Sequence, residues 1–382
     1  MRGPGFGIRL ERRPRPSPVL AFMVPVMSVV LALVLGAVFL SLTGYSPAKV
    51  YSIMFDGAFG SKYGVSETVV KAIPLMLAGL GVSLAFRMLL WNIGAEGQLY
   101  MGAFAASWVA LSFPGLPKPV LLTAMFLAGF AVGALWGLLP ALPRAFLGVN
   151  EIITSLMLNY VALYWVDYLV YGPWKDPKGY NFPLTPPFSP SAQLPTLGNT
   201  RVHLGLVFGL IGAAVIWLIL RRLKWGYEIR VIGESTPAAR YAGMNIPRNI
   251  LLVMMISGGL AGLAGMSEVS GITHRLQHGI SPGYGYTAII IAWLSKLNPV
   301  AIVGVSFLFS GLLVGGYSIQ SSGLPAATVS MLQGAILFFV LGGDILINYR
   351  LRFRSGGAGG QSKGKAAPAA PSAAGPAGGT GE

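Results

Sequence analysis

The chain has 382 residues, of which 54% are hydrophobic and only 10% are charged, whereas soluble domains carry about 25% charged residues. This composition excludes a soluble globular enzyme. Since a membrane-spanning helix needs about 20 apolar residues, the length allows roughly ten spans. The formal net charge is +15, and in a membrane protein the placement of Lys and Arg is more informative than their sum.

Ten apolar stretches predict an all-α, polytopic membrane protein with about ten transmembrane helices. They lie at about residues 18–43, 68–90, 93–113, 118–143, 152–172, 203–221, 247–270, 283–297, 299–317 and 325–348. The first follows several arginines, as in a signal peptide, but it is much longer than a signal core of about 7 to 15 residues, so we interpret it as a retained helix. The eighth and ninth are short, which also fits a broken or re-entrant pair.

The positive charges predict that both termini lie in the cytoplasm. With ten spans, most Lys and Arg residues fall on the side of the amino terminus, near residues 2–15, 221–248 and 350–365. Anionic membrane lipid of the inner leaflet attracts such a side, so no nucleic-acid partner is expected. The expected organisation is a basic cytoplasmic amino terminus (1–17), a transmembrane domain (18–350) with a distinct inner segment (226–245), and a disordered Gly/Ala/Pro-rich cytoplasmic tail (351–382).

Two predicted outer segments have patterns of their own. Residues 46–65 carry Tyr51, Met54 and Phe55 among small residues, which favours an amphipathic helix on the outer face. Residues 171–202 are rich in proline and aromatic residues. They predict an ordered loop, because aromatic side chains are costly in a merely solvated linker.

Glycines recur at four-residue spacing inside the spans. Gly129, Gly133 and Gly137 form one row, and Gly258 and Gly262 form another. Such rows let helix backbones approach closely. Packing inside one subunit is the favoured interpretation, and a dimer interface is the alternative.

The common catalytic patterns are missing from the sequence. It has no HExxH, no GxSxG and no pair of carboxylates at a spacing for acid–base work. With no cysteine and only three histidines, a metal centre is not expected. A partial phosphate-loop pattern at residues 359–366 ends in Ala366 instead of a hydroxyl that binds magnesium. We therefore predict a non-catalytic chain with no cofactor and no metal, and any ATP hydrolysis on other chains.

Five acidic residues lie within or beside the apolar stretches, where a charge is costly unless it faces a partner or a polar interior. Glu151 is expected at a helix start, where the helix dipole favours a carboxylate. Asp344 is expected in a structural pair near the inner surface. Asp167 and Glu268 fall toward outer ends, where solvation alone accounts for them, and Glu96 lies in a polar cluster.

That cluster, from Asn92 to Gln98, has two interpretations. Gly94 and Gly97 each weaken a helix by about 1 kcal/mol. A helix break here would place Asn92, Glu96 and Gln98 along a cavity. In the alternative, the cluster is a tight cytoplasmic turn between two spans.

The inner segment 226–245 contains a short predicted helix. Thr236 is a good N-cap, Pro237 suits the first helical position, and Gly243 suits the position after the helix. A helix of about six residues is marginal alone and needs a docking surface, on its own subunit or on a partner. Its small, largely apolar side chains suit a groove on another subunit; the residues are Thr236, Pro237, Ala238, Ala239, Arg240, Tyr241, Ala242 and Gly243.

Three motifs resemble the permease subunits of bacterial ABC importers for ribose-type sugars, branched-chain amino acids and nucleosides. They are the Asn92–Gln98 cluster, Val149–Tyr160 and Gly233–Asn245, and the resemblance runs from about residue 20 to 350. Asn150–Tyr160 with a long loop after it is most similar to the nucleoside or simple-sugar branch. Residues 284–286 and 298–299 also match the family, whereas Ser295-Lys296 departs from its pattern.

The resemblance implies a multi-pass permease of the bacterial inner membrane. Its implied partners are two cytoplasmic ATP-binding subunits, an extracytoplasmic substrate-binding lipoprotein, and a second permease, for which a homologous partner is favoured over a second copy. The helix from Pro237 to Gly243 would be the coupling helix of the family. The expected solute is small, polar and uncharged, such as a nucleoside or simple sugar. Candidate residues of the translocation pathway are Asn92, Glu96, Gln98, Asn159 and Glu268.

The alternative function is an ion-coupled secondary transporter that needs no ATPase partner. Glu96 and Glu268 are its best support in the sequence. Few carboxylates lie centrally in the spans, and ion coupling normally needs ionisable or converging oxygen ligands there. The sequence therefore favours the importer.

Overall fold

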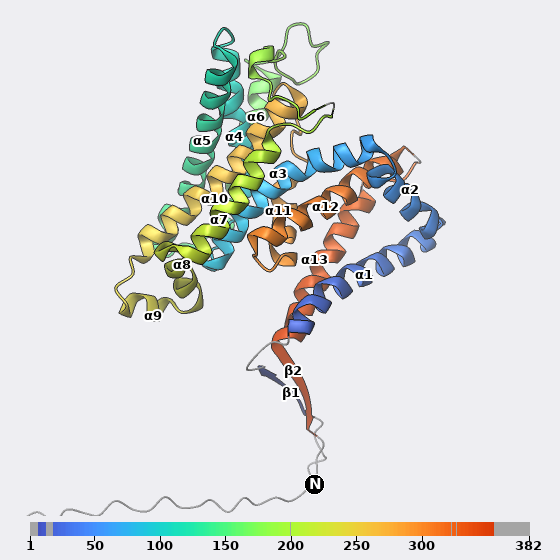
Figure 1. Cartoon of the computed structure of the whole chain (residues 1–382), viewed down its shortest axis with the longest axis vertical. Coiled ribbons are helices and arrows are strands. Elements are labelled where there is room, and N and C mark those ends of the chain that lie inside the picture. The colour runs from blue at the N-terminus through green and yellow to red at the C-terminus, as the bar shows by residue number, and fades with distance from the viewer. Residues whose placement is uncertain (1–6, 13–17, 199, 322, 326, 355–382) are drawn as a thin grey trace, which may run out of the picture.

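The computed structural model describes residues 7–12, 18–198, 200–321, 323–325 and 327–354, and it is almost entirely helical (Figure 1). Each of the ten apolar stretches coincides with a helix. These helices are α1 (Pro18–Leu42), α3 (Lys62–Arg87), α4 (Ala95–Ser112), α5 (Lys118–Leu147), α6 (Glu151–Tyr171), α7 (Gly205–Arg222), α10 (Ile246–Glu268), α11 (Tyr284–Leu294), α12 (Pro299–Gln320) and α13 (Ala327–Asn348). Among the described residues, seven helices are long and apolar enough to cross a membrane. The chain is an all-α polytopic membrane protein, and the count of ten spans stays a prediction.

Shorter elements lie between and beside these helices. They are α2 (Pro47–Phe59), α8 (Lys224–Glu234), α9 (Thr236–Tyr241), a 3-10 turn (Pro190–Ala192) and a π-helical turn (Val269–Thr273). α2 falls where the sequence favours an outer amphipathic helix, and it buries Val50, Met54 and Ala58 on one face. This four-residue spacing is that of one helix face.

The first and last described segments of the chain pair with each other. Strand β1 (Gly7–Arg12) runs antiparallel to β2 (Tyr349–Arg354), so that Gly7 faces Arg354 and Arg12 faces Tyr349. The sequence analysis predicts neither strand. β2 includes the first four residues of the segment 351–382 that is predicted to be a disordered tail, and the rest of that segment lies outside the described residues.

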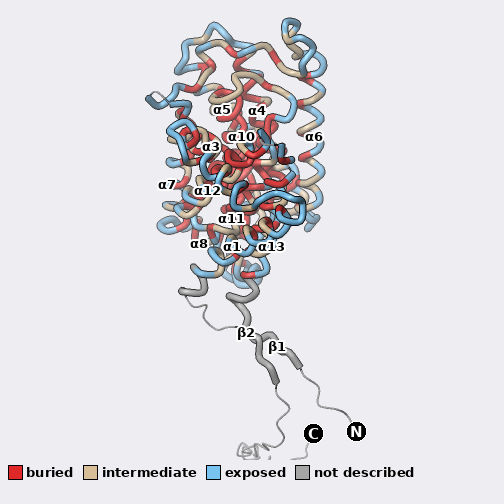
Figure 2. The backbone as a smooth tube through the Cα atoms, turned by 90° about the vertical axis from the view of Figure 1, so that its right-hand side faces the viewer, coloured by how far each residue is buried: buried red, intermediate tan, exposed pale blue. Residues whose placement is uncertain are grey.

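The centre of the bundle is formed by α3 and α10, which are buried over most of their length. α10 packs against α5, α4 and α3, and α3 also packs against α12 and α11. Figure 2 shows the buried backbone concentrated around these helices. By contrast, α1 packs mainly against α13 on one flank (Figure 1) and is largely exposed, as is α6.

Glycine allows the close approach of the central helices. A Cβ atom on Gly102 of α4 would lie 2.2 Å from the Cα atom of Gly262 in α10. A Cβ atom on Gly133 of α5 would lie 2.5 Å from the carbonyl oxygen of Gly258, also in α10. No side chain fits at such separations. The glycine rows therefore pack inside one subunit, as the favoured interpretation of the sequence holds.

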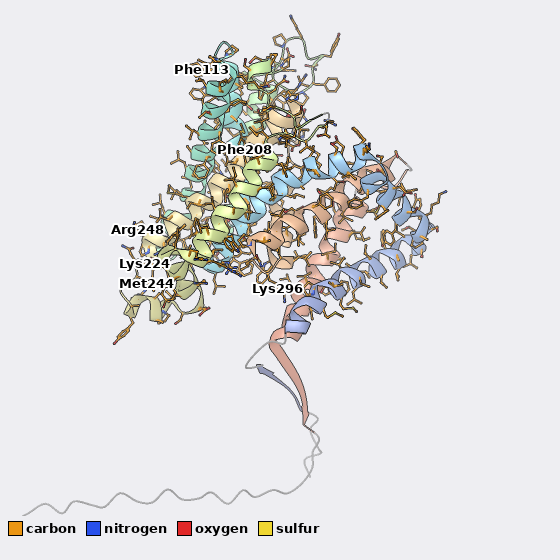
Figure 3. All side chains as sticks on the ribbon, viewed as in Figure 1. Phe113, Phe208, Lys224, Met244, Arg248 and Lys296 are labelled. Atoms are coloured by element: carbon orange, nitrogen blue, oxygen red, sulfur yellow. The ribbon has the colours of Figure 1, made fainter. Side chains whose placement is uncertain are left out.

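Segments predicted on opposite sides of the membrane lie at opposite ends of the bundle. Figure 3 places Lys224, Met244 and Arg248 at one end and Phe113 at the other. α8, α9 and the strand pair lie at the first end, which we call the basic end (Figure 1). Its assignment to the cytoplasm rests on the positive-inside rule and stays a prediction.

Candidate functional site

The polar cluster at residues 92–98 lies inside the bundle. After α3 ends, the Trp91 N–H donates to Glu151 Oε1 (3.2 Å), at the first residue of α6. Two residues later, the Ile93 carbonyl accepts from Asn159 Nδ2 (2.9 Å). Asn159 is eight residues further along α6, which is about 12 Å at the helical rise. The segment between α3 and α4 therefore runs along α6 inside the bundle, which favours the helix break over the tight turn. Its depth in the membrane stays a prediction.

Two amides of the cluster bond to each other. Asn92 Nδ2 donates to Gln98 Oε1, and Gln98 Nε2 donates to Asn92 Oδ1, both at 2.9 Å. Asn92 Nδ2 also donates to the hydroxyl of Ser257 in α10 (2.8 Å). All three side chains are buried. The buried amides of the break thus find their hydrogen-bond partners within the protein, and one of these bonds joins the break to the central helix α10.

Asn159 holds the other side of the break. Its Oδ1 accepts from the Gly97 N–H (2.8 Å), and its Nδ2 donates to the Tyr286 hydroxyl (3.2 Å) as well as to Ile93. A Cβ atom on Gly97 would lie 2.9 Å from Asn159 Oδ1. One buried side chain therefore connects the break in α4 to α6 and α11.

Glu96 lies where two helices begin. Its Oε2 accepts from the Gly285 N–H (2.6 Å) in the first turn of α11, and Glu96 is itself in the first turn of α4. A Cβ atom on Gly285 would lie 2.3 Å from the Glu96 backbone nitrogen. Helix N-termini carry partial positive charge, so a carboxylate between two of them is stabilised. Discontinuous helices of this kind mark substrate sites in many transporters.

A face of α6 beside this break carries exposed tyrosines. Tyr160, Tyr164, Tyr168 and Tyr171 are 50–66% exposed, and their spacing puts them on one side of the helix. Tyr286, whose hydroxyl bonds to Asn159, is 39% exposed. We call these five residues the tyrosine stripe. The sequence analysis misses it, although the spacing of tyrosines in residues 160–171 is its visible signal.

Glu268 lies in a different environment from the one expected. It is buried, and its Oε1 pairs with Lys71 Nζ of α3 at 3.0 Å, while the Lys71 ammonium lies 5.6 Å from the centre of the Tyr284 ring. Its Oε2 is buried with no hydrogen-bond partner in the described part of the chain. The expectation that solvation accounts for Glu268 is therefore wrong. Removing one partner of such a pair leaves a buried charge, which is strongly destabilising.

Of the other acidic residues, Glu151 lies where it is predicted, Asp167 is paired instead of merely solvated, and the side chain of Asp344 is not described. Glu151 stands in the first turn of α6 and pairs with Arg144 at 3.1 Å, as the dipole argument predicts. Asp167 Oδ1 lies 2.7 Å from His278 Nδ1 near the outer end of α6. The side chain of Asp344 lies outside the described residues.

Residues 172–198 of the predicted outer loop pack against the segment that leads into α11. The Thr185 N–H donates to the Leu276 carbonyl (2.9 Å), and the Phe188 N–H donates to the His274 carbonyl (2.8 Å). Phe188 is buried under the loop, whereas Tyr180 is 94% exposed. The loop therefore has an exposed surface and is hydrogen-bonded to the segment that precedes α11.

The short inner helix is present but is shifted by one residue. α9 runs from Thr236 to Tyr241, and its N-cap is Ser235, whose hydroxyl accepts from the Ala238 N–H (3.3 Å). Thr236, predicted as the cap, is already helical. Ala239 is fully buried against its own chain, while Tyr241 is 96% exposed. A partner can therefore meet Tyr241 but not Ala239.

α8 supports α9 and is missed by the sequence analysis. It buries Gly226, Ile229 and Ile232, which recur every three residues. Asn249 of α10 accepts from Trp225 Nε1 (2.7 Å) and donates to Glu228 Oε2 (3.0 Å). α9 is thus presented on a helix that is bonded to the centre of the bundle.

The family is decided by comparison with known proteins. Residues 64–341 match the model of the branched-chain amino acid transport system permease component. The chain belongs to this family. It is 37% identical to the glucose ABC transporter permease of Haloferax volcanii over 90% of this chain and 93% of that relative. It is 35% identical to a guanosine ABC transporter permease of Bacillus subtilis, over 87% and 95% of the two chains.

A second guanosine ABC transporter permease of the same Bacillus subtilis strain is 30% identical, over 64% of this chain and 79% of that relative. The permease described here is therefore a multi-pass membrane subunit of an ABC transporter, as its sequence motifs predict. This result favours the ATP-driven importer over the ion-coupled secondary transporter.

Proposed function

We propose that this permease forms half of an importer for a nucleoside or simple sugar, and that the solute passes along the tyrosine stripe. The relatives' names support this solute class. In the assembly, a second, homologous permease faces the stripe, two ATP-binding subunits meet α9, and a substrate-binding lipoprotein meets the outer loop. The permease itself carries no catalytic residue and needs no cofactor.

The stripe is the observation that carries the proposal. Its rings are exposed, whereas the polar groups of the neighbouring break are all buried. Aromatic faces stack on sugar rings and nucleobases, and each hydroxyl both donates and accepts a hydrogen bond. Tyr160 and Tyr286 lie beside the break at the level of Asn159, and Tyr171 lies at the outer end of α6. The stripe thus extends from the outer surface to the embedded helix starts.

Uptake by the full transporter tests the proposal. Tyr160→Ala and Tyr164→Ala should each lower the rate of guanosine or glucose uptake about tenfold, while the conservative Phe variants should retain most of it if stacking dominates. Ile153 and Met157 are similarly exposed on the same helix but lie toward the basic end. Ile153→Ala and Met157→Ala are therefore matched controls, and an equal loss in them would contradict a specific role for tyrosine.

The same preparation separates the importer from the ion-coupled alternative. Liposomes that contain the permeases without ATP-binding subunits should show no uptake under a proton or sodium gradient. Gradient-driven uptake by the permeases alone would overturn the importer assignment.

A further inference from the structure

A cavity of about 670 Å³ opens near the basic end of the bundle and shares no lining residue with the break or the stripe. It lies between α1, α7, α8 and the turn from α11 to α12, close to Lys296 in Figure 3. Its polar wall carries Arg87, Arg221, Arg230 and Lys296. No Asp or Glu is among its lining residues.

Arg87 and Arg221 are positioned by groups other than carboxylates. Arg87 donates from Nε and Nη2 to the Leu297 carbonyl at 3.2 and 2.7 Å, which uses two of the five N–H groups of a guanidinium. The Arg221 guanidinium lies 5.3 Å from the centre of the Trp217 ring. None of the ion pairs in the described part of the chain involves Arg87, Arg221 or Arg230. The cavity is therefore lined by several positively charged side chains that lie close together.

The opposite wall of the cavity is apolar. Val26 and Val29 of α1 and Val305 and Leu308 of α12 are among its lining residues. Val26 and Leu308 are 45% and 63% exposed, so the cavity has a rim that is accessible from the hydrocarbon region of a bilayer. A soluble anion would leave these apolar side chains uncovered, and an apolar molecule would leave the three arginines without an anionic partner.

We propose that the cavity binds one anionic phospholipid. The phosphate lies among the four cations, where guanidinium groups donate to its oxygens, and an acyl chain lies along α1 and α12. Basic pockets between transmembrane helices on the cytoplasmic side have this chemistry. The bound lipid fills the space between α1, which packs little on the central helices, and the α7–α8 corner that supports α9.

The test uses the complete transporter purified in detergent, incubated with phosphatidylglycerol or phosphatidylcholine, with lipid binding measured by native mass spectrometry. Arg221→Gln/Arg230→Gln removes two cavity cations. Arg222→Gln/Arg248→Gln removes the same charge from residues at the same end that do not line the cavity. At about 1 kcal/mol for each cation near a membrane surface, the first double variant should bind phosphatidylglycerol roughly thirtyfold more weakly.

The control double variant should keep the affinity of the wild type. Equal losses in both double variants would overturn the proposal, because general surface charge would then explain the binding. Equal retention of phosphatidylcholine and phosphatidylglycerol by the wild type would also overturn it. So would displacement of the lipid by inorganic phosphate at millimolar concentration, since the site would then be one for a free anion.

A second pair of variants tests the apolar wall without changing charge. Ala301→Trp places a large side chain in the cavity, whereas Val300→Trp places it on the exposed side of the same helix. Ala301→Trp should reduce phosphatidylglycerol binding at least tenfold, and Val300→Trp should leave it unchanged. Undiminished binding in Ala301→Trp, in a variant that elutes as an intact complex, would show that the lipid lies elsewhere.

Discussion

The helix break and α9 lie at two levels of the same bundle and differ in the exposure of their side chains. At the break, Asn92, Gln98 and Asn159 bond to each other or to neighbouring helices and are buried. At α9, Tyr241 extends almost fully exposed from a six-residue helix. Substitutions of these three amides should therefore act on the fold of the chain, and substitutions of Tyr241 should act on assembly.

The largest effect is expected where the central helices touch. Gly102→Ala places a methyl group 2.2 Å from the Cα atom of Gly262, so the two helices must separate. Overpacking of this kind costs about 1–3 kcal/mol or more, and folded protein in membranes should fall severalfold, as measured by detergent-extracted monodisperse yield. Gly304→Ala is the control, because a Cβ atom there meets nothing within 4 Å. Equal yields for both variants would contradict the packing.

The next largest effect is expected at α9. Tyr241→Asp should abolish co-purification with the ATP-binding subunits, or lower substrate-stimulated ATP hydrolysis at least tenfold, since an unpaired carboxylate is costly to bury in an interface. The isolated permease should keep its yield, because Tyr241 touches almost nothing in its own chain. Ala239→Asp should instead lose the folded permease itself, since Ala239 is buried. If both variants lost the folded permease, or if both lost only the ATP-binding subunits, the difference in burial between Tyr241 and Ala239 would have no consequence.

These two regions also differ in how well a sequence predicts them. Each of the ten predicted apolar stretches coincides with a helix, because an apolar run of sufficient length has few other stable conformations in a bilayer. α9 is located from its hydroxyl, proline and glycine residues, but its cap is off by one. Ser235 and Thr236 are both good caps, and only the backbone conformation shows which one stands outside the helix.

Features that depend on distant partners are beyond such a prediction. Glu268 pairs with Lys71, which lies 197 residues away in the sequence, so its burial has no local signal. The same holds for the break, whose depth is set by Asn159, and for the exposure of the tyrosine stripe. α8 is missed because its buried face is short and lies among charged residues, so its apolar pattern is weak. The face consists of Gly226, Ile229 and Ile232.

A smaller effect is expected from removing the charge between the two helix starts. In Glu96→Gln, the amide oxygen can still accept from the Gly285 N–H, so the fold and yield should be close to those of the wild type. The loss of a carboxylate from two positive helix ends should change the uptake rate by severalfold. Radiolabelled guanosine or glucose uptake by the full transporter measures this change. An uptake rate equal to that of the wild type would show that the carboxylate serves packing alone.

The smallest effect is expected from His203, in the loop before α7. Burial, with smaller contributions from His274 and Lys71, lowers the pKa of His203 to about 4. The Gly205 N–H donates to its Nδ1 (3.2 Å), which requires that nitrogen to be unprotonated. Between pH 4 and the usual histidine pKa near 6.5, the unfolded chain binds the proton that the folded chain excludes. The contribution of His203 to the free energy of unfolding should therefore be constant above about pH 6.5. It should fall as the pH is lowered from 6.5 toward 4.

Thermal unfolding of the purified permease at several pH values measures this dependence on pH. His203→Gln removes the titrating group while keeping a polar side chain of similar size, so its unfolding temperature should fall less than that of the wild type between pH 6.5 and 4.5. The two proteins should differ by a nearly constant amount above pH 7. A wild type and variant with parallel curves across the whole range would show that His203 takes up its proton in the folded protein as readily as in the unfolded chain, which is incompatible with its burial between Gly205 and Gly271.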